Sequence, residues 1–397
     1  MGVLRQRIEQ HCRIYHSEVI AIRRHIHANP ELAFAEHKTS DFIARKLDEY
    51  GIPYQRGVAK TGIVGFIEGK NKDKVIALRA DMDALPIQEE NDVPYKSKVD
   101  GVMHACGHDA HVAMLLLAAR ILNDIKDSLE GSIKLIFQPS EEALPGGAKA
   151  MIDEGVLKNP DVRHVIGQHV QPTMKSGTAG FRSGKYMAST DEIYLTVKGK
   201  GGHGALPYLN VDPVLIASHI VVAMQQIVSR MAKPDLPTVV TFGRFIAEGQ
   251  TNVTPDEVKL NGILRTFNEE WRADAHKRIT KLAKELAQSM GGECDVRIEP
   301  GYPYVVNDKN LTDNLSQFAK EYLGKRKVEE LDIRMTAEDF AYYSQEVPSS
   351  FLRIGTKTRG KEVTNLHTAT FDIDEDALFK GMGLMAYMAY RQLEEMS

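Results

Sequence analysis

The sequence predicts an α/β protein in which a mostly parallel sheet, flanked by helices, is interrupted by an inserted ferredoxin-like α+β domain. Two observations support this fold class. Outside the middle of the chain, short apolar β-rich runs alternate with helical segments, a pattern typical of a parallel sheet with helices on both faces. From about residue 189 the order changes to strand, helix, strand, strand, helix and strand, which is the ferredoxin-like order of two βαβ halves.

In the first part of the chain, Ser40 can cap a helix whose apolar face includes Phe42 and which stops at Gly51. Asp109 begins a second, strongly apolar helix that runs to residue 125. Short β-rich runs predict strands at residues 63–67, 75–78 and 132–138. Ligands of such sheets bind beyond the carboxyl ends of the strands, so we expect a functional site there.

The middle of the chain predicts four strands and two helices. The strands are expected at 193–197, 239–245, 258–265 and 294–298, and the helices at 211–231 and 269–290. We therefore expect a discontinuous domain made of residues 1–187 and 300–397, and an inserted domain at 188–299.

The composition limits the possible classes of protein. The 397 residues, with 43% hydrophobic content and no long apolar span, predict a soluble protein of two or three domains. The net charge of -4, without dense Lys/Arg clusters, favours a small-molecule substrate over nucleic acid or a membrane. Three cysteines are too few for a disulfide framework, and no secretory signal is visible. We expect a cytoplasmic protein.

Residues that commonly bind metals follow several of the apolar runs. Cys106 and His108 are two positions apart and can face the same way in an extended stretch. Glu141 and Glu142 follow the strand predicted at 132–138. Because adjacent glutamates cannot point the same way, one can bind metal while the other serves as general base. The spacing leaves open which glutamate has which role.

Two histidines complete the pattern. His169 ends a short apolar run, and His367 comes from the far C-terminal part of the chain. Taken singly, a cysteine is more often a small buried hydrophobe and a histidine a hydrogen-bonded structural residue. Together, the cysteine, the histidines and the glutamate pair favour a two-metal hydrolytic site.

Several longer motifs occur in order from the N-terminal helix almost to the C-terminus. They are RRHIHANPEL at 23–32, RADMDALP at 79–86, the segments around Cys106 and Glu141, GKGGHGA at 199–205 and AEDF at 337–340. With these motifs the chain resembles the dinuclear-metal aminoacylase and carboxypeptidase family of metallopeptidases. It is most similar to the branch of hippurate hydrolases, auxin-conjugate (IAA-amino acid) hydrolases and N-acetyldiaminopimelate deacetylases.

The resemblance implies a role for each candidate residue. Cys106 would bridge two divalent metal ions, and Glu141 would be the general base. The terminal ligands would be His108, Glu142, His169 and His367. A thiolate favours zinc, whereas carboxylates and water suit manganese, and related enzymes use zinc, manganese, cobalt or nickel.

The resemblance also implies supporting residues and a role for the inserted domain. Asp81 and Asp83 would support the ligands, with Asp83 orienting a ligand histidine. The inserted domain would act as a lid and as the surface of a homodimer or higher homo-oligomer. On it, His203 would polarise the scissile carbonyl, Arg265 would bind the substrate carboxylate, and Asn252 would lie near the same end of the substrate.

We therefore predict an aminoacylase that cleaves N-acyl amino acids with a metal-activated water and Glu141 as base. A dipeptidase or carboxypeptidase would use the same metals and differ only in the acyl pocket. A non-catalytic, metal-stabilised binding protein is a further alternative, although it would not need the spare carboxylate of the Glu141–Glu142 pair.

Overall fold

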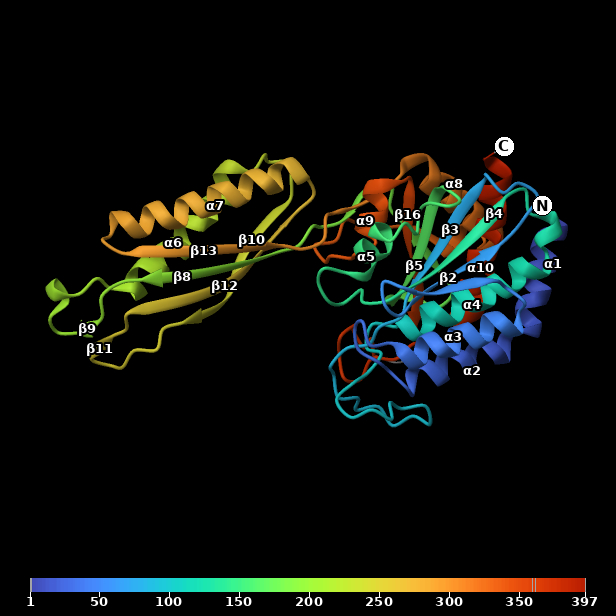
Figure 1. The fold of residues 1–397 in the computed structure, drawn as a ribbon, viewed down its shortest axis with the longest axis horizontal. Coiled ribbons are helices and arrows are strands. Elements are labelled where there is room, and N and C mark those ends of the chain that lie inside the picture. The colour runs from blue at the N-terminus through green and yellow to red at the C-terminus, as the bar shows by residue number, and fades with distance from the viewer. Residues whose placement is uncertain (1, 359, 361, 397) are drawn as a thin grey trace. The chain divides into compact units, whose positions relative to one another are not determined.

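The computed structural model describes residues 2–358, 360 and 362–396 (Figure 1). The described chain divides into two units. The first contains the residues up to 186, 306–332 and those from 339 on, and the second contains 187–305 and 333–338. Strands β7 (Gly184–Met187) and β14 (Val305–Asn307) carry the chain out of the first unit and back into it.

An eight-stranded sheet organises the first unit. Its strands are β1 (Tyr54–Val58), β2 (Gly62–Ile67), β3 (Val75–Asp81), β4 (Ser132–Gln138), β5 (Val162–Lys175), β6 (Ala179–Phe181), β15 (Val328–Glu330) and β16 (Ser349–Lys357), in the order β1-β2-β4-β3-β5-β16-β6-β15. The central strands β4, β3, β5 and β16 are parallel. This mainly parallel sheet confirms the predicted fold class.

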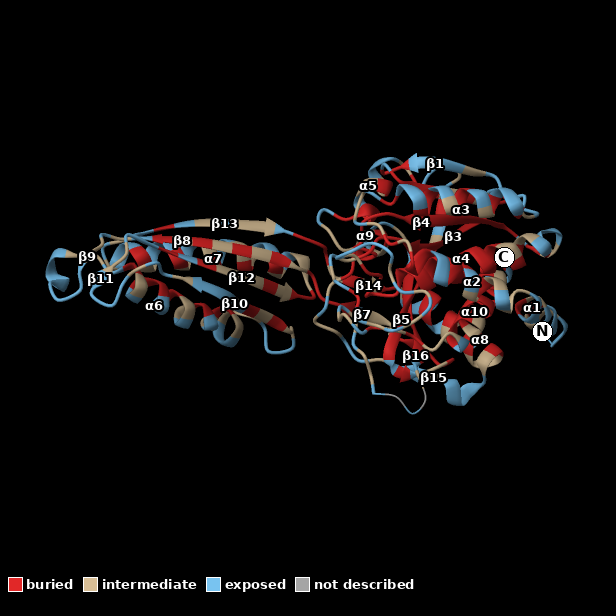
Figure 2. Cartoon of the chain, turned by 90° about the horizontal axis from the view of Figure 1, so that it is seen from below, coloured by how far each residue is buried: buried red, intermediate tan, exposed pale blue. Residues whose placement is uncertain are grey.

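Helices cover both faces of this sheet. Every residue of β3 is buried, and its alternate residues Ile76, Leu78 and Ala80 join the apolar core with α4 (His108–Asp124) and α10 (Asp376–Glu395). The other face is covered by α5 (Gly147–Asp153), which packs on β4, and by α9 (Ala341–Glu346), which packs on β16. Buried residues accordingly concentrate in the sheet and in the helix segments that face it (Figure 2).

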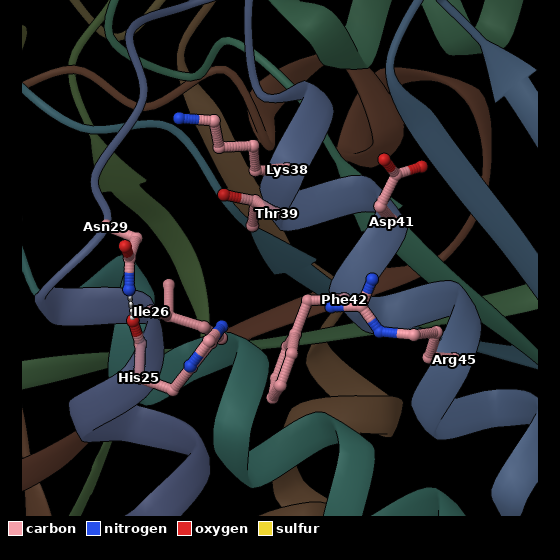
Figure 3. A pocket seen from close by; sticks show the side chains of 8 residues that line it. All are labelled: His25, Ile26, Asn29, Lys38, Thr39, Asp41, Phe42 and Arg45. Atoms are coloured by element: carbon pink, nitrogen blue, oxygen red, sulfur yellow. Dashed lines mark hydrogen bonds between the residues drawn. The ribbon is translucent and has the colours of Figure 1, made fainter.

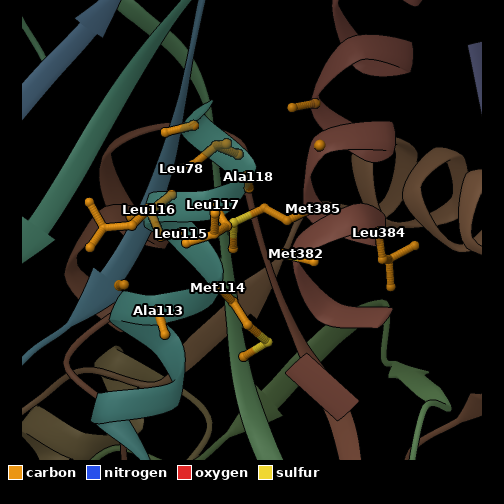
Figure 4. Close-up of a cluster of buried hydrophobic side chains, with 14 of the residues drawn as sticks. Leu78, Ala113, Met114, Leu115, Leu116, Leu117, Ala118, Met382, Leu384 and Met385 are labelled. Carbon is orange, nitrogen blue, oxygen red and sulfur yellow. The ribbon is translucent and has the colours of Figure 1, made fainter. Parts of the chain in front are cut away.

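Helices α4 and α10 pack closely against each other (Figure 4). A β-carbon at Gly381 of α10 would lie 2.1 Å from Met114 Sδ of α4, so glycine allows the helices to approach at this point. The packing fixes the helix that begins at His108 against the core.

The remaining helices of the first unit are α1 (Gly2–Ile14), α2 (His16–His27), α3 (His37–Glu49) and α8 (Lys309–Leu323), with short 3-10 turns at Lys126–Ser128 and Lys325–Lys327. The prediction that Ser40 caps a helix is wrong, because α3 already begins at His37. The carboxylate of Glu31 accepts the backbone N–H groups of Lys38 and Thr39 at 3.1 and 2.9 Å and so satisfies donors of the first turn.

The second unit has the ferredoxin-like order that the sequence predicts. Its main elements are β8 (Asp191–Lys198), α6 (Pro213–Gln226), β10 (Thr238–Ile246), β12 (Glu257–Thr266), α7 (Glu269–Ser289) and β13 (Glu293–Pro300). The strands form an antiparallel sheet in the order β10-β12-β8-β13. Residues of α6 and α7 share an apolar core with this sheet. A 3-10 turn at Pro207–Leu209 precedes α6.

Helix α6 continues through a π-helical turn at Ile227–Met231. Within the described residues, Pro213–Met231 is the one helix long and apolar enough to cross a membrane by length and composition, so the expectation of no long apolar span is wrong here. Ile216 and Ile220 of this helix are nevertheless buried in the core of the unit, whereas Leu215 and Val222 are exposed. A single helix packed on a sheet is weak evidence for a membrane span.

Candidate functional site

Cys106 and His108 flank a left-handed turn at the start of α4. Gly107 occupies the N-cap position with a φ of 88°, a conformation that favours glycine. A β-carbon at Gly107 would also lie 2.5 Å from Val170 Cγ2. The turn brings the Cys106 and His108 side chains to one place, where their ligand atoms group with those of His169.

Asp83, just beyond β3, holds two of the candidate segments together. Its carboxylate accepts the backbone N–H groups of Glu141 and Glu142 at 2.9 and 3.0 Å. The carbonyl oxygen and Oδ1 of Asp83 also lie 2.9 and 3.2 Å from His108 Nδ1. Because these oxygens are acceptors, Nδ1 donates and His108 keeps Nε2 for another partner.

The side chains of the two glutamates diverge. Glu142 Oε1 lies 3.0 Å from His367 Nε2 and 4.0 Å from His108 Nε2. Glu141 Oε1 instead accepts the backbone N–H of Asp339 at 3.4 Å. Glu142 therefore lies among the candidate ligands, with the buried Glu141 carboxylate beside them.

His169 lies inside β5, which runs on to Lys175 because it stays paired with β16 beyond His169. The apolar run therefore ends at His169 as predicted, but the strand that contains it continues to Lys175. In the register of β3 and β5, Arg79 is opposite Gly167, so His169 is level with Asp81, where β3 ends. It thus still lies at the carboxyl edge of the central strands.

The candidate residues form two groups of possible metal ligands that share Cys106. One group is Cys106, His108 and His169, the other is Cys106, Glu142 and His367, and within each group the ligand atoms lie within 4.8 Å of one another. Among these atoms, His108 Nε2 is buried without a hydrogen-bond partner, which is costly unless it binds a cation, while Glu142 Oε1 has His367 Nε2 3.0 Å away. Imidazole, thiol and carboxylate donors together fit a divalent metal.

The charges of the site also favour a cation. Contacts with Cys106 and Glu142 raise the pKa of His367 to about 10. Burial opposes a charge on His108, yet Asp81 and Cys106 keep its pKa well above the usual value. Burial raises the pKa of the Cys106 thiol. A divalent metal that binds here must displace these protons, and coordination itself deprotonates a thiol.

Two buried residues near the site have no predicted role, Arg79 and His111. Arg79 donates hydrogen bonds to Asp81 at 2.6 Å and to Asp339 at 2.7 Å, and Asp81 Oδ1 lies 2.6 Å from His111 Nδ1. Sequence signals for both exist. The two-residue period of a strand puts Arg79 and Asp81 on one face, and His111 follows His108 by three positions on one helix.

The three residues predicted on the inserted domain lie in the second unit. His203 is exposed in β9 (Gly202–His203), which pairs with β11 (Val253–Thr254), and its Nδ1 accepts the N–H of Ala205 at 3.1 Å. The carbonyl of Asn252 accepts the N–H of Gly204 in the same turn at 2.8 Å. Arg265 lies near the end of β12, away from this turn. The structure therefore brings His203 and Asn252 together, but not Arg265.

A separate surface pocket of about 240 Å³ lies between α2 and α3 (Figure 3). The ring of His25 stacks on Phe42 there, with centroids 4.2 Å apart. The acidic residue of the pocket, Asp41, pairs with Arg56. The lining of this pocket thus lacks the gathered donor atoms of the groups around Cys106.

Comparison with known proteins agrees with a metal-dependent hydrolase. Residues 77–391 match the model of peptidase family M20/M25/M40. The chain is 38% identical over 377 residues to thermostable carboxypeptidase 2 of Saccharolobus solfataricus, covering 94% of this chain and 95% of that protein. It is 39% identical over 379 residues to N-acetyl-L-cysteine deacetylase of Bacillus subtilis, covering 95% and 88%.

A solved structure shares the fold over nearly the whole length. The YXEP protein of Bacillus subtilis, a dinuclear metal-binding peptidase of the M20 family, matches with a TM-score of 0.82 and 34% sequence identity, covering 96% of this chain and 99% of that one. The chain therefore belongs to peptidase family M20/M25/M40 and is a metal-dependent hydrolase of carbon–nitrogen amide bonds.

Proposed function

We propose that this hydrolase is an aminoacylase, which cleaves N-acyl amino acids to a carboxylic acid and a free amino acid. The observation that carries the proposal is the pair of ligand groups that share Cys106, with Glu141 beside them. A purely structural metal needs no additional carboxylate, whereas hydrolysis needs a base near the activated water. The relative from Bacillus subtilis that deacetylates N-acetyl-L-cysteine supports this substrate class.

In this proposal the chain holds two divalent metal ions. Cys106 serves both ions, His108 and His169 complete one ligand group, and Glu142 and His367 complete the other. Such ions, when bound, lower the pKa of a water and polarise a substrate carbonyl. Thiolate and imidazole suit zinc and carboxylates suit manganese, so we propose one of these two ions. Metal content and activity after reconstitution with each would identify it.

Glu141 acts as the general base, taking a proton from the attacking water and returning it to the leaving amine. The whole residue is only 6% exposed, and Asp83 accepts its backbone N–H. We expect Glu141→Gln to keep the full metal content while turnover falls by about 10²–10⁴-fold. The exposed Glu68→Gln serves as the matched control. A near-native rate for Glu141→Gln would rule out this role.

Arg265 is suited to the carboxylate of the substrate. Its Nη1 atom is buried without a hydrogen-bond partner, and burial lowers its pKa. A buried guanidinium with a free donor gains most from a carboxylate, which it can bind with two parallel hydrogen bonds. We expect Arg265→Lys to raise KM more than it lowers kcat, because the binding of the substrate, not the chemistry, is weakened.

His203 and Arg265 cannot serve the same small substrate from one copy of the second unit. In β8, Asp191 lies beside the Arg265 end of β12 and Lys198 lies at the end that leads to His203. Those eight residues span about 23 Å at roughly 3.3 Å per residue. An N-acetyl amino acid spans roughly 10 Å at most. We therefore propose a homodimer in which His203 acts on the substrate of the other copy.

The surface of the second unit supports association. Large apolar side chains are exposed on α6 and the loop before it, namely Leu206, Tyr208, Leu209, Leu215 and Val222. Contiguous exposed apolar surface commonly marks an interface. Leu215→Glu combined with Val222→Glu is expected to convert a dimer to a monomer in sedimentation experiments, while the exposed Lys281→Glu on α7 is not.

A complementation experiment tests the action of His203 across subunits. Differently tagged His203→Ala and Glu141→Gln chains, purified as mixed dimers, contain one site with both native residues if His203 acts on the other copy. Such dimers should regain up to half of the native activity. If His203 acts within its own chain, every site lacks one of the two residues and the mixed dimers stay inactive.

A dipeptidase or carboxypeptidase activity is the second candidate. It rests on the carboxypeptidase from Saccharolobus solfataricus, which is as similar to this chain as the deacetylase is. Release of free amino acid from N-acetyl, N-benzoyl and longer N-acyl amino acids, measured beside dipeptides with a chelator control, separates the two. Cleavage of the N-acyl set supports an aminoacylase, and cleavage of dipeptides alone refutes it.

We also propose that the protein works in the reducing cytoplasm. Its three cysteines are buried and free, and Cys106 can ligate metal only as a thiolate, not as a disulfide. Cell fractionation would test the location.

A further inference from the structure

His111 lies one helical turn after His108 on α4, and the protein uses both of its ring nitrogens. Nδ1 lies 2.6 Å from Asp81 Oδ1, and because a carboxylate accepts, Nδ1 carries the hydrogen. Nε2 accepts the backbone N–H of Val170 at 2.9 Å. His111 is therefore a neutral imidazole with no lone pair left for a metal.

Asp81 is also occupied. Its Oδ2 accepts a hydrogen bond from Arg79 Nη1 at 2.6 Å, while Oδ1 accepts the one from His111. By distance alone, Asp81, His108 and His111 could form a metal site, since their ligand atoms lie within 4.8 Å of one another. Of these three residues, however, it is His108 whose Nε2 has no hydrogen-bond partner. The Arg79–Asp81–His111 chain ends on the backbone of Val170.

Val170 connects this chain of hydrogen bonds to a candidate ligand. Its carbonyl lies 2.7 Å from His169 Nδ1, which donates to it. With Nδ1 used in this hydrogen bond, His169 Nε2 points toward Cys106 Sγ, which lies 3.3 Å away. The rings of His111 and His169 also lie against each other, with centroids 4.5 Å apart and planes at 60°. His111 thus contacts both the His169 ring and the residue that fixes its orientation.

We infer that His111 is a positioning residue, which holds the His169 imidazole through Val170 in the orientation that ligates metal. The inference rests on the proposed two-metal site and adds to it a histidine that binds no metal itself. Loss of a group that orients a ligand histidine commonly weakens metal binding by 10–100-fold. The effect is therefore measurable in metal binding alone, without an assay of turnover.

Two amide variants separate the hydrogen bonds of His111. In His111→Gln, the longer side chain places its carbonyl oxygen near the former Nε2 and can accept the Val170 N–H. In His111→Asn, the shorter side chain places its amide near the former Nδ1 and can donate to Asp81, but it does not reach Val170. Both variants remove the imidazole, and each keeps one of its two hydrogen bonds, so a difference between them shows whether the bond to Val170 or the bond to Asp81 matters for metal binding.

The experiment is a titration of Zn²⁺, and separately of Mn²⁺, into metal-depleted full-length protein, with thermal unfolding recorded with and without metal. We expect His111→Asn to bind one ion about 10–100-fold more weakly and His111→Gln to stay within about threefold of the native protein. The rise in unfolding temperature on adding metal should shrink for His111→Asn. A merely structural residue would lower the metal-depleted unfolding temperature and leave that rise unchanged.

Three outcomes overturn the inference. Native affinity in both variants shows that His111 positions nothing, and loss of one ion from both shows that it is itself a ligand. If the native protein binds no divalent ion, the proposed function fails, and the inference fails with it. Should His111→Asn not fold, nitrogen resonances of the native protein decide instead. Zn²⁺ should shift Nε2 of His108 and His169 and leave Nε2 of His111 unchanged.

Discussion

Replacing Arg79 with methionine tests how much stability the first unit loses when the buried carboxylates of Asp81 and Asp339 have no guanidinium beside them. The Arg79 side chain is 1% exposed and both of its carboxylate partners are 0% exposed. Its Nη1 donates to Asp81 and its Nη2 to Asp339, and its Nε donates to Gln138 at 2.9 Å. Methionine fills a similar apolar volume but leaves two buried carboxylates without the guanidinium.

The expected loss can be estimated from these contacts. Removing one partner of a buried ion pair costs about 3–5 kcal/mol. The cost of leaving Asp339 without Arg79 is reduced, because Asp339 still accepts hydrogen bonds from Gln138 Nε2 at 2.7 Å and from the Ala148 N–H at 2.9 Å. At roughly 2–4 °C per kcal/mol for a domain of this size, the unfolding temperature should fall by roughly 6–20 °C.

The loss should depend on pH. In the native protein, burial raises the pKa of Asp81, but His108 and Arg79 hold it well below the usual value. Without Arg79, burial is opposed by less positive charge, and we expect the pKa of Asp81 to rise above its value in the unfolded chain. A group with a raised folded pKa loses stability as pH rises, so the deficit should be smaller at pH 5 than at pH 7.

The assay is thermal unfolding followed by circular dichroism at both pH values, with chelator present so that metal binding does not contribute. The exposed Arg163→Met on β5 is the matched control and should lie within about 0.5 kcal/mol of the native protein. A deficit below about 1 kcal/mol at pH 7, or one that grows at pH 5, would refute the account of Arg79 as a buried counter-ion.

Three other predictions concern separate features. Gly107→Ala should weaken metal binding at least tenfold, measured by chelator competition, because the new β-carbon would lie 2.5 Å from Val170 Cγ2 and φ is positive; unchanged affinity would contradict this. Asp191→Asn should cost about 3–5 kcal/mol at pH 7, since the buried Arg272 then keeps only the part-exposed Glu269 as its carboxylate partner. Burial raises the pKa of Asp191, but His276 and Arg272 outweigh burial and lower the pKa. The stability that this carboxylate provides to the native protein is therefore lost as pH falls below about 4. If Asp191→Asn loses as much free energy of unfolding on acidification as the native protein does, measured by urea unfolding, the assignment is contradicted. Chelation of the metals should abolish turnover and lower the unfolding temperature, with both restored by adding the ion back; activity that survives chelation would exclude a metal mechanism.

The sequence predicted those parts of the fold and site that depend on local pattern. The alternation of strands and helices anticipated the order of the second unit, because each of its elements has its own apolar periodicity. The sequence singled out Cys106 and His108 by their two-residue spacing, but the extended stretch expected there is wrong, because a left-handed turn at Gly107, with His108 already in α4, brings the two side chains together.

Features fixed by distant partners could not be predicted. Which glutamate faces His367 depends on the positive φ of Ser140, 51°, and on the hydrogen bonds that the two backbone N–H groups donate to Asp83, which local spacing does not reveal. The start of α3 is set by Glu31, a residue outside the helix. The role of Arg79 likewise depends on Asp339, which lies on the other side of the inserted segment.

The position of β16 in the sheet also affects the order in which the protein matures. This strand lies between β5 and β6, and the last candidate ligand, His367, follows it in the chain. On the ribosome, about 70 residues must still be made after β13 before His367 appears, which takes roughly 4–14 s at 5–20 residues per second. The second unit can fold during that time. The ligand group of Cys106, Glu142 and His367 is still incomplete then, because His367 has not yet been made. The two-metal site that we propose can therefore be completed only late in biosynthesis, after His367 has been made.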